Sequence, residues 1–219
     1  MNDKTAVLIG ATGLIGSHLL NLLQDDDHYS EIRLLVRRPL PVSHPKLKVI
    51  VINFEDDRAF SKGIEGSDTV FVAVGTTQKK VKGDLNAYRK VDYDIPVNAA
   101  HYCSEAGVKQ FLLVSSVGAS SRSNNFYLKL KGEVEDEISR MPITSINIFR
   151  PSMLLGKRNE SRPMETIAQA ISKPLGALFP SKYKPIKAFD VARAMIAAGK
   201  QNSLGYRVYH YREMMALLA

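Results

Sequence analysis

Short apolar runs rich in branched side chains alternate along this chain with segments whose apolar residues recur at helical spacing. The first run, Thr5–Ile9, predicts a strand, and the leucines from Leu14 to Leu23 predict a helix directly after it. The run Thr69–Val74 is apolar almost throughout, which is typical of a strand buried in a parallel sheet. The same pattern predicts further strands at Ile32–Val36, Leu47–Ile52, Phe111–Val114, Ser145–Phe149 and Tyr206–Tyr209.

Helical segments separate most of these strands. The spacing predicts helices over Arg58–Ile64, Leu85–Ala106, Phe126–Ser139 and Met164–Ser172. Pro96 predicts a kink or a restart within the second of them, and Asp190 is expected to be the N-cap of a last helix that runs to Ala198. Strand–helix alternation of this kind predicts the α/β class, as a doubly wound parallel sheet or Rossmann fold. We expect one domain over residues 1–219, with residues 151–189, a proline-rich stretch, forming a small C-terminal cap.

The turn after the first predicted strand carries three regularly spaced glycines. Gly10, Gly13 and Gly16 lie between Thr5–Ile9 and the helix that begins near Leu14. Glycine lets the backbone approach a phosphate closely, and the first N–H groups of the helix then face that phosphate. A strand, a glycine turn and a helix in this order predict dinucleotide binding, although a tight packing turn without a ligand is the alternative.

Two arginines follow the second predicted strand. Arg37 and Arg38 stand roughly 20 residues after the glycine turn, where a protein specific for NAD carries an acidic residue for the ribose hydroxyls. Guanidinium groups instead suit a 2′-phosphate, through paired charge-assisted hydrogen bonds. The sequence therefore predicts NADP(H) rather than NAD(H), with two exposed loop arginines as the alternative.

Hydroxyl and ammonium groups further along predict proton-transfer chemistry. Tyr127 and Lys131 are four residues apart and share one face of a predicted helix. A nearby ammonium favours the phenolate form of a tyrosine, so the pair can move a proton to or from a substrate oxygen. Ser115 and Ser116 end a predicted strand, where a hydroxyl can hydrogen-bond a substrate carbonyl. Taken alone, Tyr127 and Lys131 could simply lie on a solvated helix face. Ser115 and Ser116 could simply belong to a serine-rich turn.

Composition and charge exclude several other classes of protein. The 219 residues are 45% hydrophobic and 24% charged, as in an ordinary globular domain, and no apolar run approaches the length needed to span a bilayer. The single Cys103 predicts a core residue and no disulfide, and the five dispersed histidines predict no metal site. The net charge of +8 is scattered without a nucleic-acid motif, so we expect an anionic cofactor rather than nucleic acid. With its first strand beginning at Thr5, the chain is expected to lack a signal peptide and to be cytoplasmic.

Taken together, these motifs resemble the short-chain dehydrogenase/reductase superfamily in its atypical, extended-like branch. Within that branch the chain resembles the Tat-interacting-protein-like oxidoreductases, which are small NADP-binding proteins with a shortened C-terminal region. The resemblance covers nearly the whole chain. It is densest in Val74–Thr77, Leu113–Ala119, Tyr127–Glu135, Phe149–Leu155 and Glu160–Pro163.

The resemblance implies a role for each matching residue. It places the pyrophosphate on Gly10, Ala11, Thr12, Gly13, Leu14, Ile15 and Gly16. It places the 2′-phosphate on Arg37 and Arg38, the adenine near Phe54 and Glu55, and the ribose and nicotinamide near Val74, Gly75 and Thr76. Tyr127 would be the catalytic acid or base, Lys131 would hold the nicotinamide ribose, and Ser116, or else Ser115, would orient the substrate oxygen. Arg150, Pro151, Ser152 and Met153 would close over the nicotinamide.

The chain also departs from the wider superfamily. Val72–Thr77 replaces the Asn-Asn-Ala-Gly motif of the larger branch, and the helix asparagine of a catalytic tetrad has no certain counterpart, Asp92 and Asn98 being only nearby. Two functions are therefore expected: an NADP(H)-dependent oxidoreductase for a small carbonyl or alcohol, or a non-catalytic NADP(H)-binding regulator of a protein partner. The lack of a large substrate domain disfavours a nucleotide-sugar epimerase. By analogy alone, the protein is expected to be a monomer or a weak homodimer.

Overall fold

A computed structural model describes residues 4–156, 180–201 and 203–219. Its main sheet has seven parallel strands in the order β3-β2-β1-β4-β5-β6-β9, which confirms the doubly wound Rossmann fold. The strands are β1 (Thr5–Ile9), β2 (Glu31–Val36), β3 (Leu47–Val51), β4 (Thr69–Val72), β5 (Gln110–Val114), β6 (Ser145–Phe149) and β9 (Gly205–Tyr209). The order reverses between β1 and β4, so the carboxyl ends of these two strands form the crevice where such sheets bind ligands.

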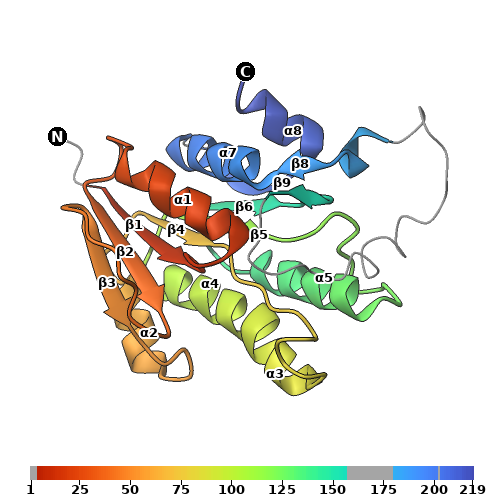
Figure 1. The fold of residues 1–219 in the computed structure, drawn as a ribbon, viewed down its shortest axis with the longest axis horizontal. Coiled ribbons are helices and arrows are strands. Elements are labelled where there is room, and N and C mark those ends of the chain that lie inside the picture. The colour runs from red at the N-terminus through yellow and green to blue at the C-terminus, as the bar shows by residue number, and fades with distance from the viewer. Residues whose placement is uncertain (1–3, 157–179, 202) are drawn as a thin grey trace.

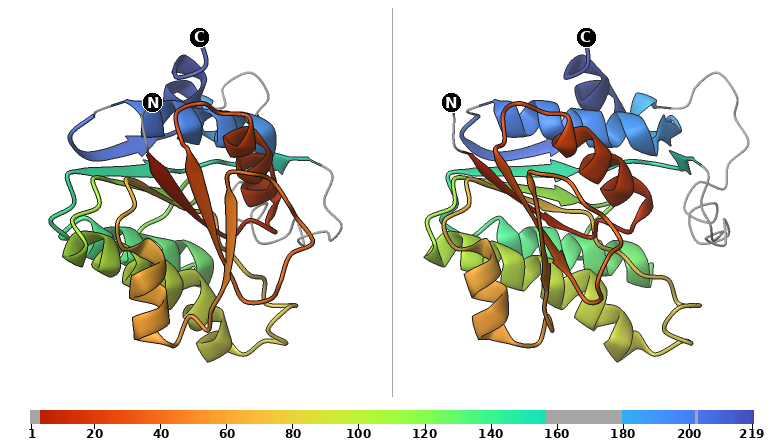
Figure 2. Two further views of the ribbon diagram at one scale, coloured as in Figure 1. Left: turned by 90° about the vertical axis from the view of Figure 1, so that its left-hand side faces the viewer. Right: turned by 60° about the vertical axis from the view of Figure 1, so that its left-hand side comes forward.

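Helices cover both faces of the sheet (Figures 1 and 2). One layer contains α1 (Leu14–Gln24), α7 (Ala188–Lys200) and α8 (Tyr211–Ala216), and the other contains α2 (Asp57–Ile64), α4 (Ile95–Glu105) and α5 (Phe126–Ile138). Successive side chains of a strand therefore enter different cores. In β4, Phe71 packs in the core under α1 and α7, whereas Val70 and Val72 pack in the core under α2, α4 and α5.

Cys103 lies fully buried in the second core, as the sequence predicted. Burial raises the pKa of its thiol. The thiol therefore stays protonated at neutral pH and packs as a small apolar side chain.

The helical segment predicted over Leu85–Ala106 is divided into three parts. These are α3 (Leu85–Arg89), a π-helical turn η1 (Lys90–Asp94) and α4. Pro96 stands at the start of α4, so the expected restart is confirmed. In a π turn the backbone hydrogen bonds span five residues instead of four, so the side chains that follow point in a different direction. Such turns are frequent at functional sites.

Two predictions near the C-terminus are wrong in detail. The last long helix begins at Ala188 after Lys187 as N-cap, so Asp190 lies in its first turn rather than at its cap. The short helix α8 after β9 was not predicted, because six residues give too little periodicity to detect.

The described parts of the expected cap form a second small sheet, in which β7 (Leu154–Leu155) pairs with β8 (Ile186–Lys187). The predicted helix Met164–Ser172 and the stretch Glu160–Pro163 lie outside the described residues. The cap over 151–189 therefore stays a prediction.

Candidate functional site

Close backbone contacts in the turn between β1 and α1 leave no room for side chains. Gly10 has a φ of +97°, and a Cβ there would lie 2.7 Å from the carbonyl group of Ala73. A Cβ at Gly16 would lie 1.9 Å from the carbonyl oxygen of Gly10, and the Gly13 N–H donates to that same oxygen at 2.9 Å. Glycine at positions 10 and 16 is therefore a requirement of the turn itself.

The N-terminus of α1 opens at the carboxyl edge of the sheet. Gly13 is its N-cap, no side chain caps it, and its first turn carries no acidic residue. The partial positive charge at this helix end is therefore not offset by a carboxylate of the helix itself. A pyrophosphate, which has negative charge and only acceptor atoms, fits this set of backbone donors. The seven residues predicted for the pyrophosphate, 10–16, form the glycine turn and the first residues of α1.

Arg37 and Arg38 follow β2 directly, and β2 is the neighbour of β1 in the sheet. Both side chains are exposed. Neither forms a salt bridge with another residue of the described part of the chain. Two guanidinium groups beside the glycine turn are thus available to an anionic group bound there.

Phe54 and Glu55 follow β3, where the adenine was expected. The ring of Phe54 packs edge-on against Phe60 at 4.8 Å between centroids. The Glu55 carboxylate forms an exposed ion pair with Lys90 at 2.6 Å. An exposed pair of this kind contributes little to stability, so it can separate when a ligand binds.

A buried ion pair joins α5 to the π turn. Lys131 Nζ lies 3.1 Å from Asp92 Oδ1, and the two side chains are 4% and 0% exposed. The other carboxylate oxygen of Asp92 accepts the backbone N–H of Thr76 at 2.6 Å. Tyr88 donates its hydroxyl to the carbonyl oxygen of Thr76 at 3.4 Å. The loop after β4, expected beside the nicotinamide, is therefore tied to the lysine predicted to hold the ribose.

Tyr127 lies in the first turn of α5, half-buried and one helical turn before Lys131. This turn is held against the segment that follows β5. The Ser120 N–H donates to the Leu128 carbonyl oxygen at 3.0 Å, and a Cβ at Gly132 would lie 2.1 Å from the Ser120 backbone. The start of α5, which carries Tyr127, is thereby held beside the segment that carries Ser116.

The two serines after β5 have different partners. Ser116 is buried and donates its hydroxyl to the carbonyl oxygen of its neighbour Val117 at 3.3 Å. Ser115 donates to the carboxylate of Glu135 on α5. Ser115 is thus engaged by a carboxylate and Ser116 by a backbone carbonyl group, and Ser116 stays the predicted contact of the substrate oxygen.

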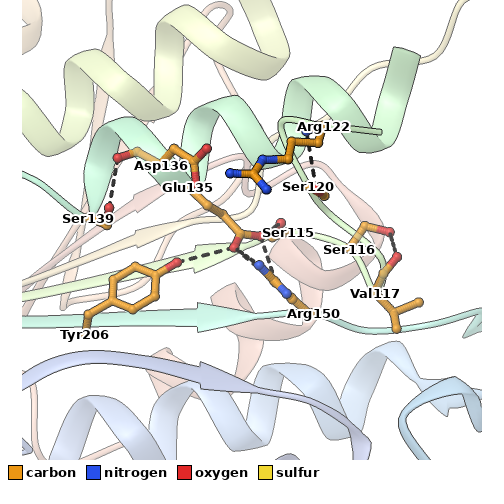
Figure 3. Close-up of polar contacts among 10 residues, drawn as sticks. All are labelled: Ser115, Ser116, Val117, Ser120, Arg122, Glu135, Asp136, Ser139, Arg150 and Tyr206. Atoms are coloured by element: carbon orange, nitrogen blue, oxygen red, sulfur yellow. Dashed lines mark hydrogen bonds and ion pairs between the residues drawn. The ribbon is translucent and has the colours of Figure 1, made fainter. Parts of the chain in front are cut away.

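Three side chains, those of Ser115, Arg150 and Tyr206, converge on Glu135 of α5 (Figure 3). Arg150, just after β6, donates to it through Nε at 3.0 Å and through Nη2 at 2.5 Å, and Tyr206 of β9 donates at 3.3 Å. Burial opposes the charged form of Arg150, but the hydrogen bonds and charge of Glu135 raise its pKa overall. Burial, together with the charge of Glu135, also raises the pKa of Tyr206. Both groups therefore stay protonated and donate to the carboxylate.

The segment Arg150–Met153 was expected to close over the nicotinamide. The Arg150 side chain is instead held by Glu135, and the Ser152 hydroxyl donates to the carbonyl oxygen of Lys184. The backbone of Pro151 accepts the Val117 N–H at 3.0 Å, so the segment lies beside the serine-bearing turn. Pro151 and Met153 remain candidates for the predicted contact.

Asp92 and Glu135 are the two site residues that sequence reasoning did not assign. Glu135 follows Lys131 by four residues and so shares the helix face of the Tyr127–Lys131 pair, which is a usable signal. The sequence analysis named Asp92 only as a neighbour of the missing tetrad asparagine and gave it no role, because a π turn is not visible in a periodicity count.

Residues 4–156, 180–201 and 203–219 offer neither a metal site nor a membrane-spanning helix. No three histidine, cysteine, aspartate or glutamate side chains in these ranges are grouped so that they could hold a metal ion. Within the same ranges, every helix is too short or too polar to cross a membrane.

Comparison with known proteins supports a nucleotide site at the glycine turn. A family model described as NAD(P)H-binding matches residues 10–201. Protein HTATIP2 from Rattus norvegicus is 32% identical over 199 residues, covering 90% of this chain and 81% of that protein. Protein FMP52, mitochondrial, from Candida albicans is 34% identical over 195 residues, covering 86% and 85%. The uronate dehydrogenase from Agrobacterium tumefaciens shares the fold, with a TM-score of 0.71, 15% identity and coverage of 95% and 76%.

The expectation of a cytoplasmic protein is contradicted by these relatives. The FMP52 proteins of Candida albicans, Meyerozyma guilliermondii and Coccidioides immitis are all named as mitochondrial. The expectation rested on the early start of the first strand and on the lone cysteine, neither of which specifies a compartment.

The family match spans most of the chain, and the glycine turn, the strand order and the Tyr127–Lys131 helix all agree with it. The resemblance to the Tat-interacting-protein-like branch is confirmed by the similarity to HTATIP2. The chain belongs to the NAD(P)H-binding family of Rossmann-fold proteins that includes HTATIP2 and FMP52.

Proposed function

We propose that this protein is an NADP(H)-dependent oxidoreductase that reduces a small carbonyl compound to an alcohol, or catalyses the reverse reaction. The observation that carries the proposal is the placement of Tyr127 one turn before the buried Lys131, on a helix held against the Ser116 segment. The NAD(P)H-binding family supports the nucleotide, and Arg37 and Arg38 support its 2′-phosphate.

In this proposal the residues have separate tasks. The glycine turn binds the pyrophosphate, and Lys131 orients the nicotinamide ribose. When bound, the reduced nicotinamide supplies a hydride to the carbonyl carbon. Ser116 donates a hydrogen bond to the carbonyl oxygen, and Tyr127 transfers its phenolic proton to that oxygen. The alcohol product has then gained one hydride and one proton, and Tyr127 recovers its proton from water.

Replacing Tyr127 by Phe tests this assignment directly. The variant keeps the ring but lacks the transferable proton, so turnover should fall at least about 100-fold while NADPH affinity changes little. The measurement is NADPH oxidation over a panel of small aldehydes and ketones, together with NADPH titration by calorimetry. Tyr211→Phe, at the start of α8 and outside the predicted cap, is the matched control and should retain activity.

Unchanged turnover in Tyr127→Phe would exclude Tyr127 as the acid. Tight NADPH binding without turnover of any compound would favour the second candidate, a nucleotide-binding regulator. The tetrad asparagine has no certain counterpart in this chain, and the residue that contacts Lys131 is an aspartate, Asp92, in the π turn η1; this keeps the second candidate open.

A further inference from the structure

We propose that the carbonyl substrate of this protein is an anion, a small aldehyde or ketone that carries a carboxylate or phosphate group. The inference names the substrate class of the proposed reaction, so it rests on the proposed function. The observation that carries it is a concentration of cations, without acidic residues, in the segments that adjoin the predicted nicotinamide and substrate contacts.

Three segments at the carboxyl edge of the main sheet carry basic side chains and no acidic ones. Residues 77–83 follow β4, residues 115–125 join β5 to α5, and residues 180–187 lead into α7 (Figure 1). All seven of their cationic side chains are exposed, and apart from Lys80 none forms an ion pair within the described part of the chain. These cations are Lys79, Lys80, Lys82, Arg122, Lys182, Lys184 and Lys187.

The opposite edge of the sheet has the reverse balance of charge. Residues 25–30, 65–68, 106–109 and 139–144 each lead into a strand at the amino edge. Together these four segments contain five acidic residues and two basic ones. The basic character of the carboxyl edge is therefore a local property, and not the net charge of +8 spread evenly over the surface.

Two of the basic segments are continuous with the proposed catalytic residues. Residues 115–125 contain Ser116 and run directly into the helix that carries Tyr127. Residues 77–83 continue from Thr76, which was predicted to lie beside the nicotinamide. The strands that precede these two segments, β4 and β5, are neighbours in the sheet, so both segments start from the same part of its carboxyl edge.

The third basic segment is attached to the residues predicted to close over the nicotinamide. The Ser152 hydroxyl donates to the carbonyl oxygen of Lys184. The Ile186 N–H donates to the carbonyl oxygen of Met153 at 3.0 Å. Residues 180–187 are thus held beside the same predicted contact, and their three lysines add to the positive charge there.

The nucleotide alone does not account for these cations. Its predicted 2′-phosphate contacts, Arg37 and Arg38, follow β2, whereas the basic segments belong to the other side of the point where the strand order reverses. The pyrophosphate is predicted at the glycine turn, and a nicotinamide ring is either neutral or cationic. Positive charge on the nicotinamide side therefore matches an anionic group of the substrate. A cleft lined by one sign of charge also raises the local concentration of an oppositely charged ligand.

The test compares two aldehydes of the same shape and different charge, 4-carboxybenzaldehyde and 4-formylbenzamide. The Kd of each is measured by calorimetry on the protein loaded with NADP+, which requires no turnover. At low salt the anion should bind at least about fivefold tighter, because several exposed cations each contribute a small attraction. At about 0.5 M salt the preference should shrink, because these charges are exposed to solvent.

A second pair of compounds distinguishes the two anionic groups. Comparison of 4-formylphenyl phosphate with 4-methoxybenzaldehyde repeats the measurement for a phosphate. The larger of the two preferences identifies the group that the site takes. Equal affinity within both pairs, or no binding of either anion, overturns the inference.

The triple variant Lys79→Gln/Lys82→Gln/Arg122→Gln tests which cations are responsible. All three side chains are exposed, so the variant should fold normally. It should lose most of the preference for the anion, while its NADPH affinity changes less than about twofold. A preference that survives in this variant, or a loss of NADPH affinity in its place, overturns the inference.

The matched control removes the same charge from exposed positions elsewhere. Lys62→Gln/Lys109→Gln/Arg207→Gln should keep the preference for the anion, because these residues lie on α2, before β5 and on β9. An equal loss of preference in the control would assign it to the net charge of the protein and overturn the inference. A binding preference without NADPH-dependent reduction of any carbonyl compound would count against the proposed function alone.

Discussion

Replacing Glu135 by Ala should destabilise the protein by about 3 kcal/mol, and at least 2 kcal/mol after allowance for the partial exposure of Arg150. The reason is that the substitution leaves a partly buried guanidinium without its carboxylate and removes the acceptor of the Ser115 and Tyr206 hydroxyls. Each buried donor that is left without an acceptor adds its desolvation penalty to the loss of stability. The measurement is chemical denaturation of the two proteins at neutral pH.

The same helix supplies a matched control. Glu137 forms a pair with Arg140 at 3.5 Å, but both side chains are largely exposed. Exposed pairs of this kind contribute between zero and about 1 kcal/mol, so Glu137→Ala should leave the free energy of unfolding nearly unchanged. Equal losses in the two variants would show that the Glu135 cluster is not an anchor of α5.

Replacing Gly16 by Ala should weaken NADPH binding at least tenfold and lower the stability of the free protein. In an ordinary helix the same change raises stability by roughly 0.5–1 kcal/mol, so the sign of the effect is informative. Here the new Cβ would lie 1.9 Å from the Gly10 carbonyl oxygen, which is backbone and cannot rotate away. The turn must open, and the N–H groups at the start of α1 then move out of register with the pyrophosphate.

Gly66→Ala is the control, because it replaces a glycine by alanine where the new Cβ meets no other atom. Gly66 has a φ of +70°, but nothing lies within 4 Å of the position its Cβ would take. Alanine there costs only local backbone strain, about 1 kcal/mol, and NADPH affinity should not change. A Gly16→Ala protein with raised melting temperature and intact NADPH affinity would contradict the role given to the turn.

The fold was largely predictable because its signals are local. Branched apolar runs such as Thr5–Ile9 and Ser145–Phe149 appear as strands with the predicted bounds, and the glycine turn joins β1 to α1 as expected. Errors fall where local signals are weak. The helix that begins at Ala188 has no side-chain cap to mark its start, so Asp190 was a misleading signal.

The partners of the site residues were much less predictable. Ser115, Glu135, Arg150 and Tyr206 come from four elements separated by up to 91 positions, and only the packing of α5 on the sheet brings them together. Asp92 is directed toward Lys131 by a π turn, which no residue type specifies. Sequence reasoning could therefore name Tyr127 and Lys131, but it could not show that Lys131 has a buried carboxylate beside it.

The most direct test of the account is a calorimetric titration of the protein with NADPH and with NADH, repeated on Arg37→Ala/Arg38→Ala. The account predicts NADPH binding at least tenfold tighter than NADH binding, because Arg37 and Arg38, which form no salt bridge within the described part of the chain, would hold the 2′-phosphate. The double variant should lose that preference and keep its NADH affinity, whereas Arg193→Ala on α7 should match the unaltered protein. Equal affinity for the two nucleotides, or a preference that survives loss of both arginines, would contradict it.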